Sequence, residues 1–126
     1  MTISRRQARR QALFLLYQWD LSGQQIGSQY AGEIDPWARE VAGTVAEHAV
    51  ELDARITSAA EGWTADRLGA VERSALRVAV HELESHDVPP EVAINEAVAF
   101  TKRYASEDGA RLVNGILGRI QREERV

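Results

Sequence analysis

The strongest constraint on the fold is the spacing of the apolar residues, which recur every three or four positions through most of the chain. Near the N-terminus this spacing follows one face of an α-helix that begins after Ser4, a suitable N-cap, with Ala8, Ala12, Leu15, Leu16 and Trp19 on that face. No stretch alternates β-branched and polar residues over the length of a strand. The sequence therefore predicts an all-α protein.

The same periodicity predicts four further major helices. One long helix is expected over residues 37–60, and a broad apolar sector marks 71–83 as the central helix. Pro89 and Pro90 must interrupt the chain after it, because a proline disfavours the α conformation in the preceding residue. The next helix runs to about Tyr104, and a last one follows it. A length of 126 residues favours a single compact domain.

The composition and motifs do not point to catalysis or to metal binding. The chain has no cysteine, which excludes disulfides and thiolate chemistry and permits a reducing compartment. His48, His81 and His86 do not form a zinc-binding HExxH pattern, and phosphate-binding and nucleophile motifs are missing. No apolar run approaches the ~20 residues of a membrane span. We expect a cytoplasmic protein that is not an enzyme, has no cofactor or metal, and carries no signal peptide or anchor.

Charge is strongly segregated along the chain. Residues 1–22 carry four basic and one acidic side chain, residues 23–101 carry five basic and fourteen acidic, and residues 102–126 carry six basic and four acidic. Two basic ends around an acidic middle predict one face for a polyanion and another for a basic partner, provided that the ends meet in the fold. Ordinary solvated helix surfaces are the alternative interpretation.

The first helix carries the residues that point most directly to RNA. Arg5 and Arg9 are four residues apart, as are Arg6 and Arg10, so four guanidinium groups share one broad side, and Tyr17 lies further along it. Guanidinium groups bind phosphates and an aromatic ring stacks on an unpaired base. We expect all four arginines to be replaceable without disturbing the core face. The alternative is a solubilising basic segment with Tyr17 half in the core.

Two polar pairs interrupt apolar helix faces in the C-terminal third. Asn95-Glu96 would need hydrogen-bonding partners if buried. Asn114-Gly115 keeps the helical spacing of its neighbours, so we interpret it as helix and not as a hairpin turn. A glycine there costs about 1 kcal/mol relative to alanine, so close packing against another backbone or against RNA is expected to compensate.

Three sets of motifs, in order along nearly the whole chain, resemble the NusB family. The N-terminal set is Arg5-Arg6-Gln7-Ala8-Arg9, Ala12-Leu13 and Leu16-Tyr17-Gln18-Trp19-Asp20. The middle set is Trp63, Arg67-Leu68, Val71-Glu72-Arg73, Leu76-Arg77-Val78-Ala79 and His81-Glu82-Leu83. The C-terminal set is Val88-Pro89, Val92-Ala93-Ile94-Asn95-Glu96-Ala97-Val98 and Leu112-Val113-Asn114-Gly115-Ile116-Leu117. Leu112 departs from the family, which often has phenylalanine there, and Gln7 stands where a basic residue is common.

The resemblance implies two perpendicular helical subdomains, about 1–60 and 61–126, packed as one compact domain. It also implies a transcription antitermination factor of the elongation complex. Such a factor binds the single-stranded boxA element of nascent ribosomal RNA together with NusE, a ribosomal protein of the small subunit. Glu72 matches an acidic position that faces NusE. The RNA contacts implied residue by residue are Arg5, Arg6, Arg9, Tyr17, Asp108 and Arg111, to which the arginine pattern adds Arg10.

Two other functions are compatible with the sequence. One is a protein-only helical adapter or homodimer that does not touch RNA, because helical bundles with acidic faces commonly bind proteins. The other is kinship to the NusB-like RNA-binding domain of a ribosomal RNA cytosine methyltransferase, without a methyl-donor domain in this sequence. Titration with RNA distinguishes the adapter from an RNA-binding protein.

Overall fold

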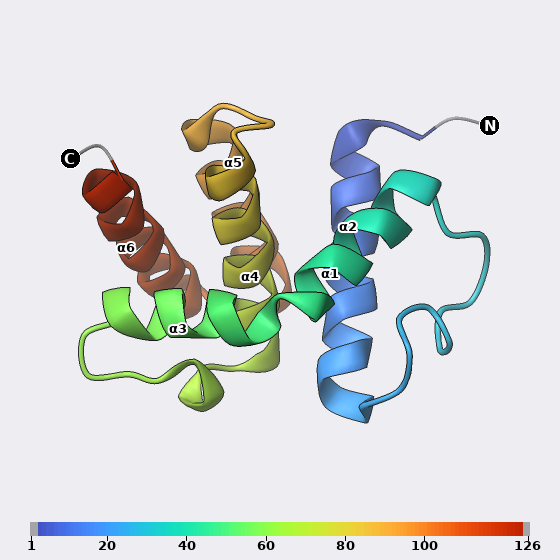
Figure 1. The fold of residues 1–126 in the computed structure, drawn as a ribbon, viewed down its shortest axis with the longest axis horizontal. Helices are drawn as coiled ribbons and strands as arrows, with labels where there is room; N and C mark the ends of the chain where they lie inside the picture. Colours follow the sequence, from blue (N-terminus) through green and yellow to red (C-terminus); the bar gives the residue numbers. More distant parts are fainter. Residues whose placement is uncertain (1–2, 125–126) are drawn as a thin grey trace.

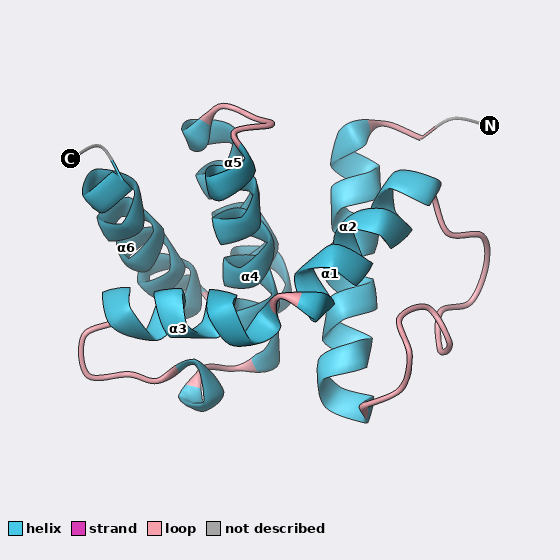
Figure 2. Ribbon diagram, viewed as in Figure 1, coloured by secondary structure: helices cyan, strands magenta, loops and turns pink. Residues whose placement is uncertain are grey.

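A computed structural model describes residues 3–124, which form six α-helices and one short 3-10 helix and contain no strand (Figures 1 and 2). The all-α prediction is confirmed. No helix within this range is long and apolar enough to cross a membrane. The elements are α1 (Arg5–Ser22), α2 (Pro36–Glu47), α3 (Ala49–Ala59), η1 (Ala65–Arg67), α4 (Ala70–Ser85), α5 (Pro90–Tyr104) and α6 (Glu107–Glu124).

α4 is the central helix, as its broad apolar sector predicted. It contacts each of the other five α-helices. The whole segment from Ser74 to Val80 is buried, so no side of α4 in this stretch faces solvent. The core therefore forms around α4, and the remaining helices lie on the surface with one apolar face each.

Local signals in the sequence set the ends of several helices. Ser4 caps α1 through a capping box with Gln7, and Gly23 ends it with a φ of 72°, a conformation that glycine adopts readily. The side chain of Asp35 accepts hydrogen bonds from two backbone N–H groups at the start of α2. Ser106 Oγ accepts a bond of 2.9 Å from the N–H of Gly109 at the start of α6. The N-cap predicted at Ser4 is confirmed, and Ser106 caps α6 through the same bond to the residue three positions on.

The single long helix predicted over 37–60 is wrong, because the chain turns at His48 and forms α2 and α3. His48 has φ −104° and ψ 16°, outside the helical range, and its Nδ1 lies 2.9 Å from the carbonyl oxygen of Thr44. The turn lets α2 pack against α1 while α3 packs against α4 and α6 (Figure 1). The apolar spacing continues in phase through the turn, so periodicity alone gave no sign of the break.

The break also bears on the predicted subdomains. By residue number α3 belongs to the first of them, yet its contacts with α4 and α6 attach it to helices of the second. α1 and α2 lie together on one side of the molecule in Figure 1, with α3, α5 and α6 on the other. The division near residue 60 stays a prediction.

Two buried groups of ion pairs fasten α1 to α4. Near the start of α1, Arg9 donates from Nε and Nη2 to both carboxylate oxygens of Glu82 at 2.8–3.1 Å. Near its end, Asp20 accepts from Arg73 Nε at 3.2 Å and from Arg77 Nη1 at 3.1 Å. Because an early residue of α1 pairs with a late residue of α4 and the reverse, the two helices run antiparallel.

The second group also reaches α3. Arg77 donates from Nε and Nη2 to the two carboxylate oxygens of Asp53, at 2.7 Å each. Burial raises the pKa of Asp20, but hydrogen bonds and charges from Arg73 and Arg77 outweigh it and hold the pKa below its usual range. Burial lowers the pKa of Arg77, and its bonds to Asp53 and Asp20 more than offset this. Three helices are thus joined by ion pairs that centre on Asp20 and Arg77.

Replacing Asp20 by asparagine should lower the free energy of unfolding by about 3 kcal/mol, because it leaves Arg73 and Arg77 without a buried counter-charge. The pKa of Asp20 is depressed in the folded state below an unfolded value of about 3.9. The ionised Asp20 therefore contributes fully to the free energy of unfolding above that pH. This contribution is lost as the pH falls through the pKa of Asp20 in the folded protein. Urea unfolding of parent and variant between pH 7 and pH 2 measures both effects.

The exposed Asp108 gives the control, since Asp108→Asn should change the free energy of unfolding by less than about 0.5 kcal/mol. Equal stabilities of Asp20→Asn and the parent at pH 7 would show that the second group of ion pairs does not hold α1 in place. If the parent and Asp20→Asn differ in the free energy of unfolding by the same amount from pH 7 to pH 2, the lowered pKa of Asp20 is contradicted.

Candidate nucleic-acid interface

The start of α1 presents three exposed arginines, Arg5, Arg6 and Arg10. Arg9 lies between them in the sequence, but it pairs with Glu82 of α4 and is only 4% exposed. The guanidinium group of Arg5 lies 4.2 Å from the centre of the Trp37 ring, a cation–π contact with α2. Arg6 Nε lies 3.1 Å from Glu96 Oε1 on α5. The described residues offer no ion-pair partner to Arg5 or Arg10.

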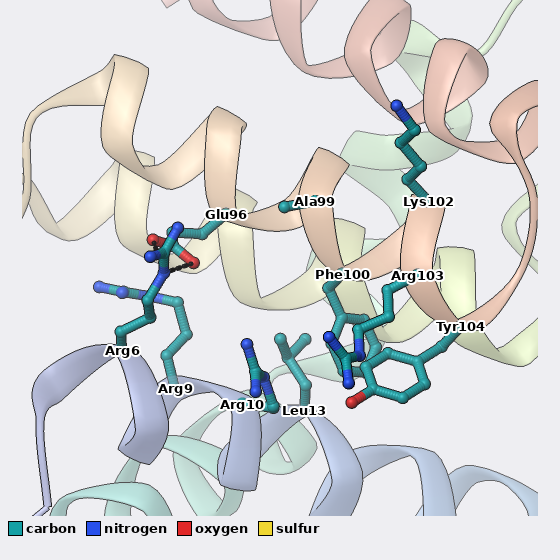
Figure 3. Close-up of a pocket in the computed structure, with 10 residues that line it drawn as sticks. All are labelled: Arg6, Arg9, Arg10, Leu13, Glu96, Ala99, Phe100, Lys102, Arg103 and Tyr104. Atoms are coloured by element: carbon teal, nitrogen blue, oxygen red, sulfur yellow. Dashed lines mark hydrogen bonds and ion pairs between the residues drawn. The ribbon is translucent and has the colours of Figure 1, made fainter.

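A groove of about 300 Å³ runs between α1 and α5 (Figure 3). α1 contributes Arg6 and Arg10, and α5 contributes Lys102 and Arg103 from its last turn. Lys102 and Arg103 begin the basic segment 102–126, so the groove brings residues of the two basic segments together. The complete lining is Arg6, Arg9, Arg10, Leu13, Glu96, Ala99, Phe100, Lys102, Arg103 and Tyr104.

Aromatic rings lie beside these charges. Phe14, Phe100 and Tyr104 form a cluster with ring centres 4.8–5.5 Å apart, and Tyr104 is 37% exposed. The guanidinium group of Arg103 lies 5.5 Å from the centre of the Tyr104 ring. Tyr17 is half-buried and lines an adjoining hollow of about 150 Å³ with the same three rings. Basic groups and partly open rings thus meet along one groove, the combination that binds single-stranded nucleic acid.

Lys102, Arg103, Phe100 and Tyr104 were not among the residues predicted from the sequence. Their signal was present, because residues 100–104 place two basic residues between two aromatic ones. What the sequence could not show is that α5 lies alongside α1, with Glu96 beside Arg6 and Tyr104 beside Phe14. Asn95-Glu96 is also explained in part, since Glu96 finds its partner in Arg6.

Asp108 and Arg111 lie at the start of α6, where they pair with each other and remain exposed at 89% and 73%. Arg111 lines a second, open groove between α5 and α6 with Asn114 and Gly115. Lys102 lines this groove as well as the first. The α5–α6 groove therefore continues the α1–α5 groove around the end of α5.

Comparison with known proteins gives the same answer as the motifs. The model of the NusB family matches residues 6–122. The chain belongs to the NusB family. The transcription antitermination protein NusB of Rubrobacter xylanophilus is 43% identical over 122 residues, covering 91% of this chain and 88% of that protein.

Solved NusB structures share the fold. T. maritima NusB is 32% identical, with a TM-score of 0.84, covering 98% of this chain and 94% of that one. A chain of the crystal structure of antitermination factors NusB and NusE in complex with double-stranded RNA is also 32% identical, with a TM-score of 0.82. That match covers 94% of this chain and 96% of the other. The predicted family and NusB-like fold are confirmed.

Glu72, which matches the position facing NusE, lies in the first turn of α4 and is half-buried. Its carboxylate crowds Gly69, where an added Cβ would approach Oε2 to 2.7 Å. A Cβ added to Gly109 would lie 3.3 Å from the Cγ of Glu72. Glu72 thus lies between the starts of α4 and α6, next to Val71, which lines the Tyr17 hollow. The predicted protein contact and the predicted RNA contacts are therefore on neighbouring surfaces of this NusB chain.

The expectation that all four arginines lie outside the core is wrong for Arg9. Its guanidinium group is paired with Glu82, and both side chains are 5% exposed. A phosphate would reach Arg9 only after this pair opened. Helical spacing placed Arg9 one turn from Arg5 correctly, but it could not show that Glu82 of α4 meets it there.

Arg9→Ala should lower the free energy of unfolding by about 3–5 kcal/mol, because it leaves the carboxylate of Glu82 buried without its partner. Arg10→Ala, one residue away but exposed, should change it by less than about 0.5 kcal/mol. Urea unfolding of the two variants provides the comparison. If the two variants lose the same free energy of unfolding, the Arg9–Glu82 pair does not stabilise the fold.

Proposed function

We propose that this chain is a non-enzymatic transcription antitermination factor that binds boxA RNA in the α1–α5 groove, together with NusE. The observation that carries the proposal is the groove itself, where Arg6 and Arg10 of α1 and Arg103 of α5 lie on opposite walls beside Tyr104, with Lys102 at the edge. The NusB in a similar solved structure is in complex with NusE and RNA, which supports the same partners here. Action on a nascent transcript implies a cytoplasmic location.

Each part of the groove has a separate task in this proposal. Arg6 and Arg10 contact phosphates from the groove, with Arg103 on the opposite wall and Lys102 at its edge, and Arg5 contacts a phosphate from beside Trp37, outside the groove lining. The ring of Tyr104, at 37% exposure, offers a face for an unpaired base. Arg9 acts indirectly, because its buried pair with Glu82 fixes the turn of α1 that carries Arg6 and Arg10. A partly open ring between cations favours a single strand, whose bases are free to stack.

The double variant Arg6→Ala and Arg10→Ala should weaken binding of a boxA-like single strand and flatten its salt dependence. Each lost phosphate contact reduces the slope of log affinity against log salt by about 0.7 for a single strand. The magnitude of the slope should therefore fall by about 1.4 from a parent value of roughly −2 to −3.5 for three to five contacts. Fluorescence anisotropy across a salt series measures both quantities.

Arg39 and Arg67 are exposed arginines outside the grooves, so replacing both with alanine gives a control of equal charge change. The slope of log affinity against log salt for the control variant should stay close to that of the parent. If the Arg6 and Arg10 variant is folded and binds as tightly as the parent across the salt series, the α1–α5 groove does not bind RNA. A protein-only adapter would then be the better function.

For NusE we propose a contact at Glu72, on the acidic middle of the sequence. Glu72→Lys should slow association with NusE and raise the Kd, most clearly at low salt, because charge complementarity accelerates encounter. Stopped-flow association with purified NusE at several salt concentrations measures the effect. Since Glu72 is half-buried at the start of α4, melting of the variant is checked first, and Glu72→Gln serves as the milder change. Unchanged rates and affinity for both variants would remove Glu72 from the interface.

A further inference from the structure

Gly115 has no structural explanation within the protein. It lies in the interior of α6, where glycine is less stable than alanine. A Cβ built on it meets nothing within 4 Å, so the expected packing against another backbone is wrong for the described residues. Gly43 of α2 is equally open, so openness alone does not imply a ligand. What distinguishes Gly115 is its place, because it lines two neighbouring grooves.

The second of these grooves has an exposed aromatic ring on its far side. It measures about 390 Å³ and lies between α6 and the segment that follows α3. Trp63, in that segment, is 47% exposed and lines the groove with Gly115. We call this space the Trp63 groove. An indole half open to solvent beside a bare stretch of helix backbone is a platform on which a planar group can stack.

Arginines line the Trp63 groove along α6. Arg111 and Gly115 line both this groove and the α5–α6 groove, so the two are continuous. Arg122 is exposed at the far end and has no ion-pair partner among residues 3–124. Arg119 forms ion pairs with Glu61 at 2.9 Å and with Glu123 at 3.4 Å. Its charge is therefore already neutralised within the protein, and its side chain serves mainly as a wall of the groove.

We infer that RNA bound in the α1–α5 groove continues along α6 into the Trp63 groove, where a base stacks on Trp63 and Arg122 contacts a phosphate. The path passes from Lys102 to Arg111 and over Gly115, whose lack of a side chain lets the strand approach the helix backbone. From Arg111 to Arg122 the helix rises about 16 Å, enough for more than one nucleotide. The inference rests on the proposed function, since it extends the same strand.

RNA fits this surface better than a protein segment does. Arg111 and Arg122 place positive charge at its two ends, Arg111 beside Asp108 and Arg122 without an ion-pair partner among residues 3–124, and a nucleic acid carries charge at every residue. The stretch between them offers a ring and exposed backbone, with Leu112 and Ile116 beneath, and does not offer the deep apolar pocket in which a protein anchor would bury.

The experiment uses two RNA probes and the full chain. One probe is a minimal boxA-like strand, and the other is the same strand extended by several nucleotides, prepared with the extension at either end. Trp63→Ala should weaken binding of the extended strand about 5- to 150-fold, the range for loss of one base stack. It should leave the minimal strand unchanged, and Trp63→Phe should restore most of the lost affinity. Arg122→Gln should reduce the salt slope for the extended strand by about 0.7.

Gly115→Ala gives a test that poor folding cannot imitate. It should raise the melting temperature by about 3 to 5 °C through helix propensity, while weakening the extended strand several-fold. Gly43→Ala is the matched control, because it also fills open space inside a helix and should raise the melting temperature without changing RNA affinity.

The two proposals fail in different ways. If Trp63→Ala and Gly115→Ala bind the extended strand like the parent while the Arg6 and Arg10 variant loses the minimal strand, the path along α6 is wrong and the α1–α5 groove stands. If the Arg6 and Arg10 variant binds the minimal strand normally, the proposed function fails first. If Trp63→Ala weakens NusE binding and leaves RNA binding unchanged, the Trp63 groove is a protein surface and the inference is overturned.

Discussion

The antiparallel attachment of α1 to α4 is the constraint on which the rest of the structure depends. Two buried ion-pair groups, Arg9 with Glu82 and Asp20 with Arg73 and Arg77, fix α1 at both ends of its contact with the central helix. The apolar face of α1 already resists sliding and rotation, and the ion pairs add to this because a displaced pair leaves buried charges unpaired. The rotation of α1 about its axis therefore follows from these residues, and with it the direction in which Arg6 and Arg10 point.

That rotation explains why the basic ends of the chain meet. With Arg9 paired to α4, its neighbours Arg6 and Arg10 lie toward α5, where Arg6 meets Glu96 and Arg103 of the last turn points toward α1 (Figure 3). Phe14 packs edge-on against Phe100 and Tyr104, so apolar contacts between the same two helices keep the groove walls in register. The charge segregation along the sequence thus becomes a segregation in space because α1 and α5 both pack on α4.

The sequence predicted well what depends on local chemistry and poorly what depends on contacts between distant residues. The capping box at Ser4, the proline start of α5 and the buried character of α4 all follow from neighbours in the chain. The turn at His48 does not, because α2 and α3 separate only to reach different partners while their apolar spacing stays in phase. Arg9 shows the same limit for the site. Its residue type and spacing match an RNA contact, and only Glu82, 73 positions away, makes it a core residue.

The exposed arginines also differ in how freely they can bind a phosphate. Arg6 is paired with Glu96 and Arg111 with Asp108, so a phosphate that binds either one must displace a carboxylate and leave it nearby. Such an exchange gains less than a new ion pair, since the displaced carboxylate repels the strand. Arg10 and Arg122 have no carboxylate partner within residues 3–124, so a phosphate at either position displaces nothing of the protein. The net electrostatic gain should therefore come mainly from these unpaired arginines. The paired ones add geometric selectivity, because only a phosphate at the right position can replace the carboxylate that already satisfies them.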